Sequence, residues 1–278
     1  MTICSYYSIC GTPIKLQSPL QEINTFCDFM LYAFKEENLS ESECTLVSVE
    51  RNLYYSDYYD IYKNGQIAFD FGMKMKGVHY SVMSKALENI VSGHAINQID
   101  KKELISLHSG AISKNNKGIL ILGESGDGKS TFTLEMVAQH NYEYLSDEIG
   151  LLDKELFLHP FIKTVSFKPG IVKLNDSWIC KRFANEFQVK VPEKLYGQKV
   201  PLKAIFTVKY NPDNQTSIQP MQKKDMLKRL FNAQIGRERY IAEVGQIADI
   251  VKRVPVYRIE HNSASEAAKA VDNLLFGI

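Results

Sequence analysis

The sequence is poor in the features that mark secreted or zinc-binding proteins. Its 278 residues contain a single tryptophan and five cysteines, an odd number with no C-x-x-C pair. Free thiols in a reducing compartment fit this pattern better than a disulfide framework or a zinc site. The cysteines are Cys4, Cys10, Cys27, Cys44 and Cys180.

Long apolar runs and targeting patterns are also missing. No segment approaches the roughly 18 apolar residues that a membrane-spanning helix needs. The N-terminal stretch MTICSYYSIC lacks a basic segment followed by a long apolar one, as an export signal would have. We therefore expect a cytoplasmic protein with no membrane partner.

An excess of charge of one sign is absent as well. Lys and Arg total 33 against 32 for Asp and Glu, which gives a formal net charge of +1. Such a balance gives no reason to expect a nucleic-acid partner. The tyrosine-rich stretch 54–62 has no interleaved basic residues, so a strand surface explains it better than a platform for stacked bases.

The pattern along the chain changes near residue 97. Residues 1–97 mix short strands with a helix and include Asn64-Gly65 at a hairpin turn, which predicts a small α+β region and a plausible place for substrate docking. In this region Ser18 and Pro19 resemble the N-cap and first residue of a helix. From residue 98 to 278 strands alternate with helices, so we expect an α/β domain there.

Several elements of this second part are predicted from local patterns. Strands are expected at 104–107, 118–122, 144–146, 149–152, 201–208 and 256–259, and helices at 129–140 and 223–233. A closing helix begins after Ser263, with Glu266 three residues later as a capping box. The basic residues around 223–239 fit a solvated helix face, with the docking of an acidic partner as the alternative; they are Lys223, Lys224, Lys228, Arg229, Arg237 and Arg239.

The stretch GESGDGKST, residues 123–131, fits the pattern G-x-x-x-x-G-K-[ST] and lies between a predicted strand and a predicted helix. Glycines let the backbone curl so that its N–H groups face a phosphate, to which the helix N-terminus adds its positive end. Lys129 would reach the β- and γ-phosphates, and Ser130 would bind Mg²⁺. The predicted nucleotide-binding residues are Gly123, Glu124, Ser125, Gly126, Asp127, Gly128, Lys129, Ser130 and Thr131.

Two acids, Asp147 and Glu148, directly follow the predicted strand at 144–146. Carboxylates at the end of a strand beside a phosphate loop are placed to bind Mg²⁺ and to accept a proton from an attacking hydroxyl. The alternative is that the two acids form a polar surface turn after a buried strand and have no role in catalysis. Upstream, His108 also ends a predicted strand, where a lone histidine is usually structural.

Taken together, these residues resemble the catalytic domain of HPr kinase/phosphorylase and its kinase-only relatives. The resemblance rests on His108, on Lys129 twenty-one residues later within GESGDGKST, and on the acidic pair in LSDE. It covers roughly residues 104–275, with weaker similarity in PFIKTVSFK, PLKAIF and PVYRI. It implies a P-loop kinase domain of the HPr-kinase type.

The resemblance also implies a role for each matching residue. ATP is the phosphate donor, Lys129 and the loop hold its phosphates, and Ser130 and Asp147 bind Mg²⁺. One acid of the pair accepts the proton of a serine hydroxyl, and His108 supports the pair. Because the family usually has two aspartates where this chain has Asp147 and Glu148, either acid is a candidate base.

Three departures from the family narrow the expected activity. The glycine-rich segment with an acidic metal ligand is absent, which implies kinase activity without the phosphorylase reaction. Lys163 and Lys168 in its place are candidate phosphate contacts, with solvated surface as the alternative. Residue 131 is Thr where the bacterial regulators commonly carry Glu, and residues 1–97 do not match their N-terminal domain, so a regulator of sugar uptake is disfavoured. Kinase-only relatives of this family occur beside genes for ribosomally made peptides, including lasso peptides. The resemblance therefore suggests a serine of a peptide precursor as the phosphate acceptor.

These observations together predict an ATP- and Mg²⁺-dependent kinase that phosphorylates a serine or threonine hydroxyl of a peptide or protein, such as a ribosomal peptide precursor. A small-molecule hydroxyl kinase and a non-catalytic, nucleotide-gated binding module are the alternatives. A homo-oligomer is compatible with the sequence.

Overall fold

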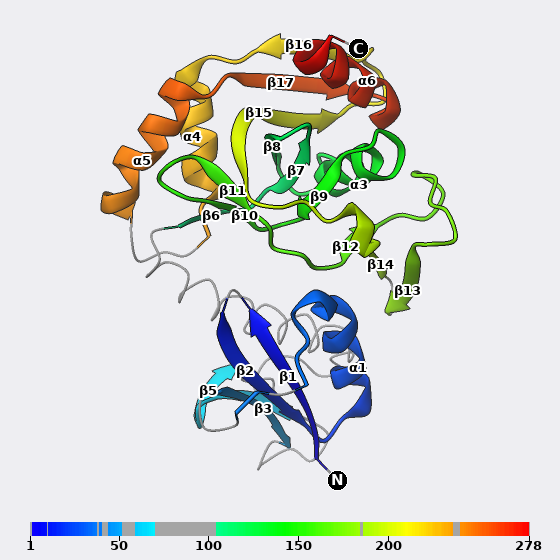
Figure 1. The fold of residues 1–278 in the computed structure, drawn as a ribbon, viewed down its shortest axis with the longest axis vertical. Coiled ribbons are helices and arrows are strands. Elements are labelled where there is room, and N and C mark those ends of the chain that lie inside the picture. Colours follow the sequence, from blue (N-terminus) through cyan, green and yellow to red (C-terminus); the bar gives the residue numbers. More distant parts are fainter. Residues whose placement is uncertain are drawn as a thin grey trace. The chain divides into compact units, whose positions relative to one another are not determined.

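The structure is a computed structural model of the chain, and it describes residues 2–9, 11–37, 39–40, 44–51, 59–69, 104–183, 186–235 and 240–277. The chain forms two compact units, one of residues 1–99 with 182–186 and the other of residues 100–181 with 187–278. The boundary predicted after residue 97 lies outside the described residues. Both units combine helices with β-sheet, so the protein is of mixed α/β class (Figure 1).

The first unit contains a five-stranded sheet in the order β1-β2-β3-β4-β5. Helix α1 (Gln21–Met30) packs on β1 and β2 and buries Ile23, Phe26 and Phe29. A short 3-10 turn, η1 (Tyr32–Phe34), follows the helix. The strands are β1 (Ile3–Ile9), β2 (Thr12–Ser18), β3 (Thr45–Arg51), β4 (Tyr59–Lys63) and β5 (Gln66–Phe69).

One prediction for this unit is confirmed and another is wrong. Asn64 and Gly65 join β4 to β5 with φ of 48° and 77°, as a two-residue hairpin turn requires. Ser18, however, ends β2, and the N-cap of α1 is Leu20. The Ser18 hydroxyl accepts a hydrogen bond from the Leu20 N–H at 3.0 Å, so it stabilises the turn between strand and helix.

The second unit is built on a nine-stranded mixed sheet. Its main path runs β6-β10-β11-β15-β8-β7-β9, and β17 lies between β15 and β16. The strands are β6 (Ile105–Leu107), β7 (Gly110–Lys114), β8 (Lys117–Leu122), β9 (Glu143–Ser146), β10 (Gly150–Leu152), β11 (Phe157–His159), β15 (Val200–Tyr210), β16 (Ser217–Pro220) and β17 (Val256–His261).

Strand β7 was not predicted, and it changes how the sheet is connected. The strand at 104–107 was expected to precede the strand of the phosphate loop directly, but β7 lies between them in sequence and pairs antiparallel with β8. Its sequence, GAISK, has no regular alternation of polar and apolar residues. All of its first four residues are buried, since β8 and β9 pair along its two edges and α3 packs against it.

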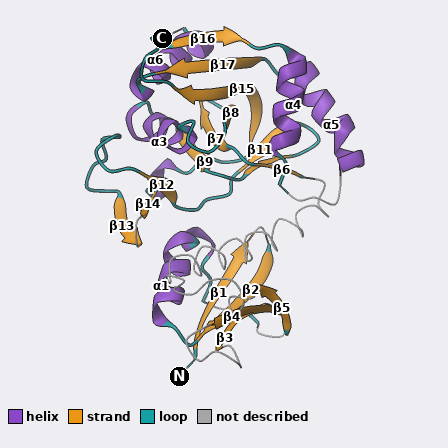
Figure 2. Ribbon diagram, turned by 180° about the vertical axis from the view of Figure 1, so that it is seen from behind, coloured by secondary structure: helices purple, strands orange, loops and turns teal. Residues whose placement is uncertain are grey.

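Helices lie on both sides of this sheet, as Figures 1 and 2 show. Helix α3 (Lys129–Gln139) packs on β7, β8 and β15, and α6 (Ala264–Phe276) packs on α3, β16 and β17. On the other side, α4 (Lys223–Ala233) and α5 (Tyr240–Arg253) bury Met226, Leu230 and Ile247 against strand residues such as Leu120 and Ile205.

A smaller sheet of three strands, β12-β14-β13, follows β11 in the chain. These strands are β12 (Val165–Phe167), β13 (Ile179–Phe183) and β14 (Glu186–Lys190), and a short turn, η4 (Glu193–Leu195), leads back to β15. Among the helices in the described part of the chain, none is long and apolar enough to cross a membrane.

Candidate active site

The sheet of the second unit brings the predicted site residues to one edge. Both β8 and β9 pair antiparallel with β7, so they run parallel to each other and their carboxyl ends meet where β7 begins. The phosphate loop follows β8, Asp147 follows β9, and His108 precedes β7. Three segments that are separate in sequence therefore converge at this edge, which is where open α/β sheets bind ligands.

The loop between β8 and α3 has the backbone that its glycines permit. Gly126 and Gly128 have φ of 91° and 90°, in the left-handed region that glycine tolerates best. A Cβ atom on Gly123 would lie 3.0 Å from the Val208 carbonyl oxygen and 3.1 Å from Lys129 Cγ. Only glycine therefore lets this loop approach both β15 and the lysine so closely.

Hydrogen bonds within and beside the loop hold it in shape. Lys129 is 7% exposed, and its Nζ donates to the carbonyl oxygens of Gly123 at 2.8 Å and Glu124 at 3.2 Å. Asp127 Oδ2 accepts from the Glu124 N–H at 2.6 Å, and the Asp127 carbonyl accepts from the Tyr210 N–H at 3.0 Å. The ammonium group thus lies inside the curve of the loop, where a phosphate would meet it.

Asp147 is the most unusual acid of the site. It is 1% exposed, and neither carboxylate oxygen has a hydrogen-bond partner among the described residues. Burial and then the charge of Glu148 raise its pKa to about 7, against the opposing effects of the Ser130 hydroxyl and of Lys163 and Lys129. A carboxyl group that titrates near neutral pH is well matched to accept a proton.

Glu148 lies beside Asp147 in a strained backbone conformation. Its φ of 76° is uncommon for a residue with a long side chain, and such strain concentrates at functional sites. Its Oε2 lies 2.7 Å from Lys163 Nζ, and the Lys163 side chain is 3% exposed. Tyr144 Oη donates to the Lys163 carbonyl oxygen at 3.1 Å, which ties this segment to β9.

His108 joins the same electrostatic cluster from the start of β7. Partial burial and the charges of Lys129 and Lys163 lower its pKa, against the effect of Glu148. The imidazole is therefore harder to protonate than that of a free histidine. Its backbone N–H donates to the Ala233 carbonyl at 2.6 Å, which joins this edge to the end of α4.

The remaining predicted residues have different placements. The loop tip at Glu124, Ser125 and Gly126 is exposed, and Thr131 is half-buried in the first turn of α3. Lys168 is exposed after β12, and among the described residues it makes no hydrogen bond or ion pair with the site. The structure thus brings Lys163, but not Lys168, against the acidic pair.

The residues at this edge fit a magnesium ion. Mg²⁺ prefers oxygen ligands and is usually held by one or two protein groups together with phosphate oxygens and water. The buried oxygens of Asp147 have no partner in hydrogen-bonding geometry among the described residues. The Ser130 hydroxyl is nevertheless near enough to lower the pKa of this carboxylate. The described residues contain no cluster of three or more His, Cys, Asp or Glu that could hold a metal, and a magnesium site of this kind does not need one.

Two aromatic residues beside the loop were not singled out from the sequence. Tyr210, at the end of β15, is 50% exposed, and its ring centroid lies 5.8 Å from that of His261. His261 ends β17 and is 2% exposed, and its ring nitrogens have no hydrogen-bond partner among the described residues. No sequence motif marks either residue, because they reach the loop only through the pairing of β15 with β8 and β17.

Comparison with known proteins gives little beyond this geometry. No model of a protein family matches the chain, and no curated protein matches it. One solved structure that is similar to it is the HPr(Ser) kinase/phosphatase from Coxiella burnetii, with 13% identity. That similarity covers 61% of this chain and 95% of the other, with a TM-score of 0.32, which is a distant likeness.

Proposed function

We propose that the second unit is an ATP- and Mg²⁺-dependent kinase of the HPr-kinase type, which phosphorylates a serine or threonine hydroxyl of a peptide or protein. The observation that carries the proposal is Asp147, a buried carboxylate whose pKa is raised to about 7, at the same sheet edge as the loop that holds Lys129. The loop supplies the phosphate site and the carboxylate supplies the base.

In this reaction the acceptor oxygen attacks the γ-phosphorus of ATP. The new bond joins the hydroxyl oxygen to phosphorus, the bond from phosphorus to the β–γ bridging oxygen breaks, and ADP leaves. The hydroxyl proton passes to the Asp147 carboxylate. Lys129 and the loop N–H groups hold the phosphate oxygens and offset the charge that develops on them.

The ion pair of Glu148 and Lys163 positions the base in this proposal. The positive charge of Lys163 lowers the pKa of Asp147, while the negative charge of Glu148 raises it. Their contact at 2.7 Å keeps both charges near the carboxylate, so the pKa of Asp147 depends on the pair. His108, whose pKa partial burial and the charges of Lys129 and Lys163 lower, lies at the start of β7 in the same group.

Ser130 would hold Mg²⁺ together with the ATP phosphates, and Asp147 is the second candidate ligand. When bound, the ion would neutralise negative charge on the phosphates. A metal-bound carboxylate stays ionised through neutral pH and cannot also serve as the base. The two roles of Asp147 are therefore alternatives, and we favour the base because its pKa is near 7 without a metal.

Single-turnover transfer from γ-labelled ATP tests the proposal. The Asp147→Asn variant should bind ATP with little change and lose transfer by about 100-fold or more, as expected for removal of a general base. Glu148→Gln, its matched neighbour, should retain more activity. If Glu148→Gln loses transfer and Asp147→Asn does not, Glu148 is the base instead.

The choice of acceptor decides among the kinds of kinase. Serine-containing peptides and proteins should gain the label, whereas free serine and sugars should not. Labelling of free hydroxy compounds alone would indicate a small-molecule kinase. Tight ATP binding without label on any acceptor, including the chain itself, would overturn the proposal in favour of a nucleotide-gated binding module.

A further inference from the structure

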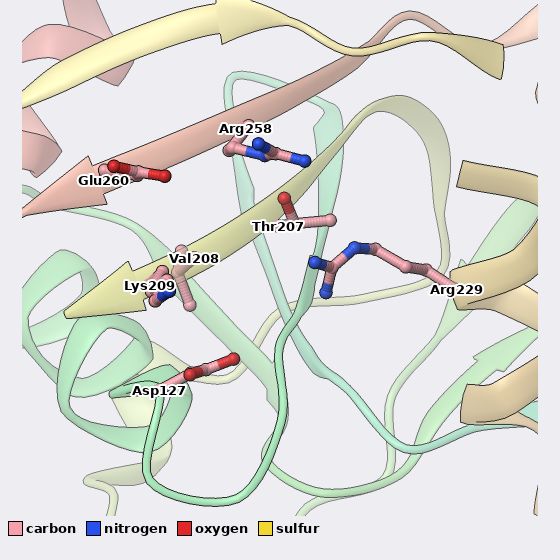
Figure 3. Close-up of a pocket in the computed structure, with 7 residues that line it drawn as sticks. All are labelled: Asp127, Thr207, Val208, Lys209, Arg229, Arg258 and Glu260. Carbon is pink, nitrogen blue, oxygen red and sulfur yellow. The ribbon is translucent and has the colours of Figure 1, made fainter. Parts of the chain in front are cut away.

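A pocket lies beside the phosphate loop, on the side of β8 away from the acids. It has a volume of about 110 Å³ and is lined by side chains of β15, β17, α4 and the phosphate loop (Figure 3). In the pairing of these strands Thr207 lies opposite Arg258 and Lys209 opposite Glu260. Arg229 reaches the pocket from α4.

Two arginines, Arg229 and Arg258, line this pocket. Figure 3 shows the guanidinium groups of Arg229 and Arg258 near the Thr207 side chain. Within the described residues neither arginine makes a hydrogen bond or an ion pair; Arg229 is half-buried and Arg258 is exposed. An anion between two guanidinium groups that line the same pocket would accept charge-assisted hydrogen bonds from both.

The two acids that line the pocket are already engaged elsewhere. Asp127 Oδ2 accepts a hydrogen bond from the Glu124 N–H at 2.6 Å, and Glu260 Oε2 accepts one from Asn214 Nδ2 at 3.1 Å. With Arg229, Arg258 and Lys209 against these two carboxylates, the pocket has a net positive charge.

Thr207 adds a third donor at the base of the pocket. The residue is 2% exposed, and among the described residues its hydroxyl donates to Met221 Sδ at 4.0 Å, a weak acceptor. The hydroxyl can turn to an anionic oxygen at little cost. Two guanidinium groups and a hydroxyl offer more donors than a carboxylate needs, and they match the several oxygens of a phosphate group.

We propose that Arg229, Arg258 and Thr207 form a second oxyanion site, beside the phosphate loop and lined in part by Asp127 of that loop, that binds the phosphate group of a small ligand. With a volume of about 110 Å³, the pocket has room for a phosphate group. Of the basic residues predicted on α4, Lys223, Lys224 and Lys228 are exposed, and Arg229 lines the pocket.

Phosphate binding to the full chain tests this site independently of the phosphate loop. In a Lys129→Ala background, titration with inorganic phosphate followed by ³¹P NMR should still show one saturable site. Arg229→Gln and Arg258→Gln should each weaken that site by about tenfold or more, because each removes a charge-assisted hydrogen bond. Arg253→Gln, which removes the same charge from an exposed i,i+4 pair with Asp249, should leave it unchanged.

Equilibrium dialysis provides a second measurement that does not depend on the Lys129 variant. At a free phosphate concentration near the dissociation constant of the site, Arg258→Gln should bind less phosphate per chain than the unmodified protein, whether or not the phosphate loop binds phosphate. Equal binding at that concentration, or phosphate binding that all three arginine variants weaken alike, would overturn the proposal. If the unmodified protein binds phosphate at the site of Arg229 and Arg258 but not at the phosphate loop, the result would instead count against the proposed kinase.

The source of the phosphate group is resolved by a parallel titration with O-phosphoserine. Tighter binding of O-phosphoserine than of inorganic phosphate, with the same dependence on Arg229 and Arg258, would assign the site to an organic phosphate. Equal or weaker binding would assign it to the free ion. Both results support the oxyanion site, whereas binding of O-phosphoserine that is independent of the two arginines contradicts it.

Discussion

At the scale of single residues, the main feature of the site is the effect of neighbouring charges on the pKa of one buried carboxylate, that of Asp147. Asp147 has a raised pKa because it is buried and faces Glu148, and Lys163 and Lys129 keep that rise in check. The sequence placed these residues in the site by motif and resemblance, but the pairing of Glu148 with Lys163 follows only from the fold. Lys163 and Lys168 appear alike in the sequence, and burial distinguishes them.

Replacing Lys163 with Met should move the pH dependence of transfer to higher pH. Its charge lowers the pKa of Asp147, so its loss raises that pKa above about 7 and the base remains protonated to a higher pH. The acidic limb of kcat/KM, measured from pH 5.5 to 9, should shift upward by about one unit. Lys168→Met, at an exposed position, is the control and should leave the acidic limb at the same pH. An unshifted limb in Lys163→Met would show that the charge of Lys163 does not influence the pKa of the base.

Asp147 should also make the protein less stable as the pH rises. Its pKa is raised from 3.8 to about 7 in the folded state, so folding takes up a proton between these values and the free energy of unfolding falls as pH rises through this window. In metal-free buffer, Asp147→Asn should unfold at a higher temperature than the unmodified protein at pH 8, by up to a few kcal/mol in stability. Near pH 4 the difference should vanish; an equal difference at both pH values would contradict the assignment.

At the scale of elements, local patterns predicted those that have their own start and stop signals. Helix α4 spans Lys223–Ala233 as expected, and Ser263 caps α6 by accepting a hydrogen bond from the Glu266 N–H. Strands β11 and β12 have three residues each and were not predicted, since pairing with distant segments determines such short strands. Helix α5 was not identified either, although its residues have a helical apolar period.

The approach of the phosphate loop to β15 can be tested at a single glycine. In Gly123→Ala the new methyl group would meet the Val208 carbonyl at 3.0 Å, so the loop or the strand must shift, at a cost of about 1–3 kcal/mol. We expect a lower free energy of unfolding and at least about tenfold weaker ATP binding, because the Lys129 hydrogen bond to Gly123 lies in the displaced segment.

Gly245→Ala in α5 is the matched control for this variant. A Cβ atom there meets nothing within 4 Å, and alanine favours helix over glycine by about 1 kcal/mol. This substitution should raise stability slightly and leave ATP binding unchanged. Comparable ATP affinity in Gly123→Ala and Gly245→Ala would show that the loop tolerates a side chain at residue 123.

At the scale of the whole molecule, the two compact units should respond differently to nucleotide. The loop, the acids and the lysines all belong to the unit of residues 100–181 and 187–278. At 100 times its dissociation constant, ATP with Mg²⁺ should stabilise this unit by about 2.7 kcal/mol, a rise in its unfolding temperature of about 5–10 °C. Differential scanning calorimetry should show the shift in one transition only.

Lys129→Ala provides the control for this measurement. It should abolish the shift, because the ammonium group inside the loop is lost. A shift that persists in this variant would place the nucleotide elsewhere in the chain. A shift of equal size in a separate transition of the first unit would mean that nucleotide binding involves both units.

Strand β7 acts as a spacer in this sheet. Neighbouring strands lie about 4.8 Å apart, so the ends of β8 and β9 are separated by roughly twice that distance. An incoming oxygen, a phosphorus atom and an outgoing oxygen in line span only about half of that length, so the gap also has room for the side chains that would contact them. The width of a single antiparallel strand therefore sets the distance between the phosphate loop and the acidic pair.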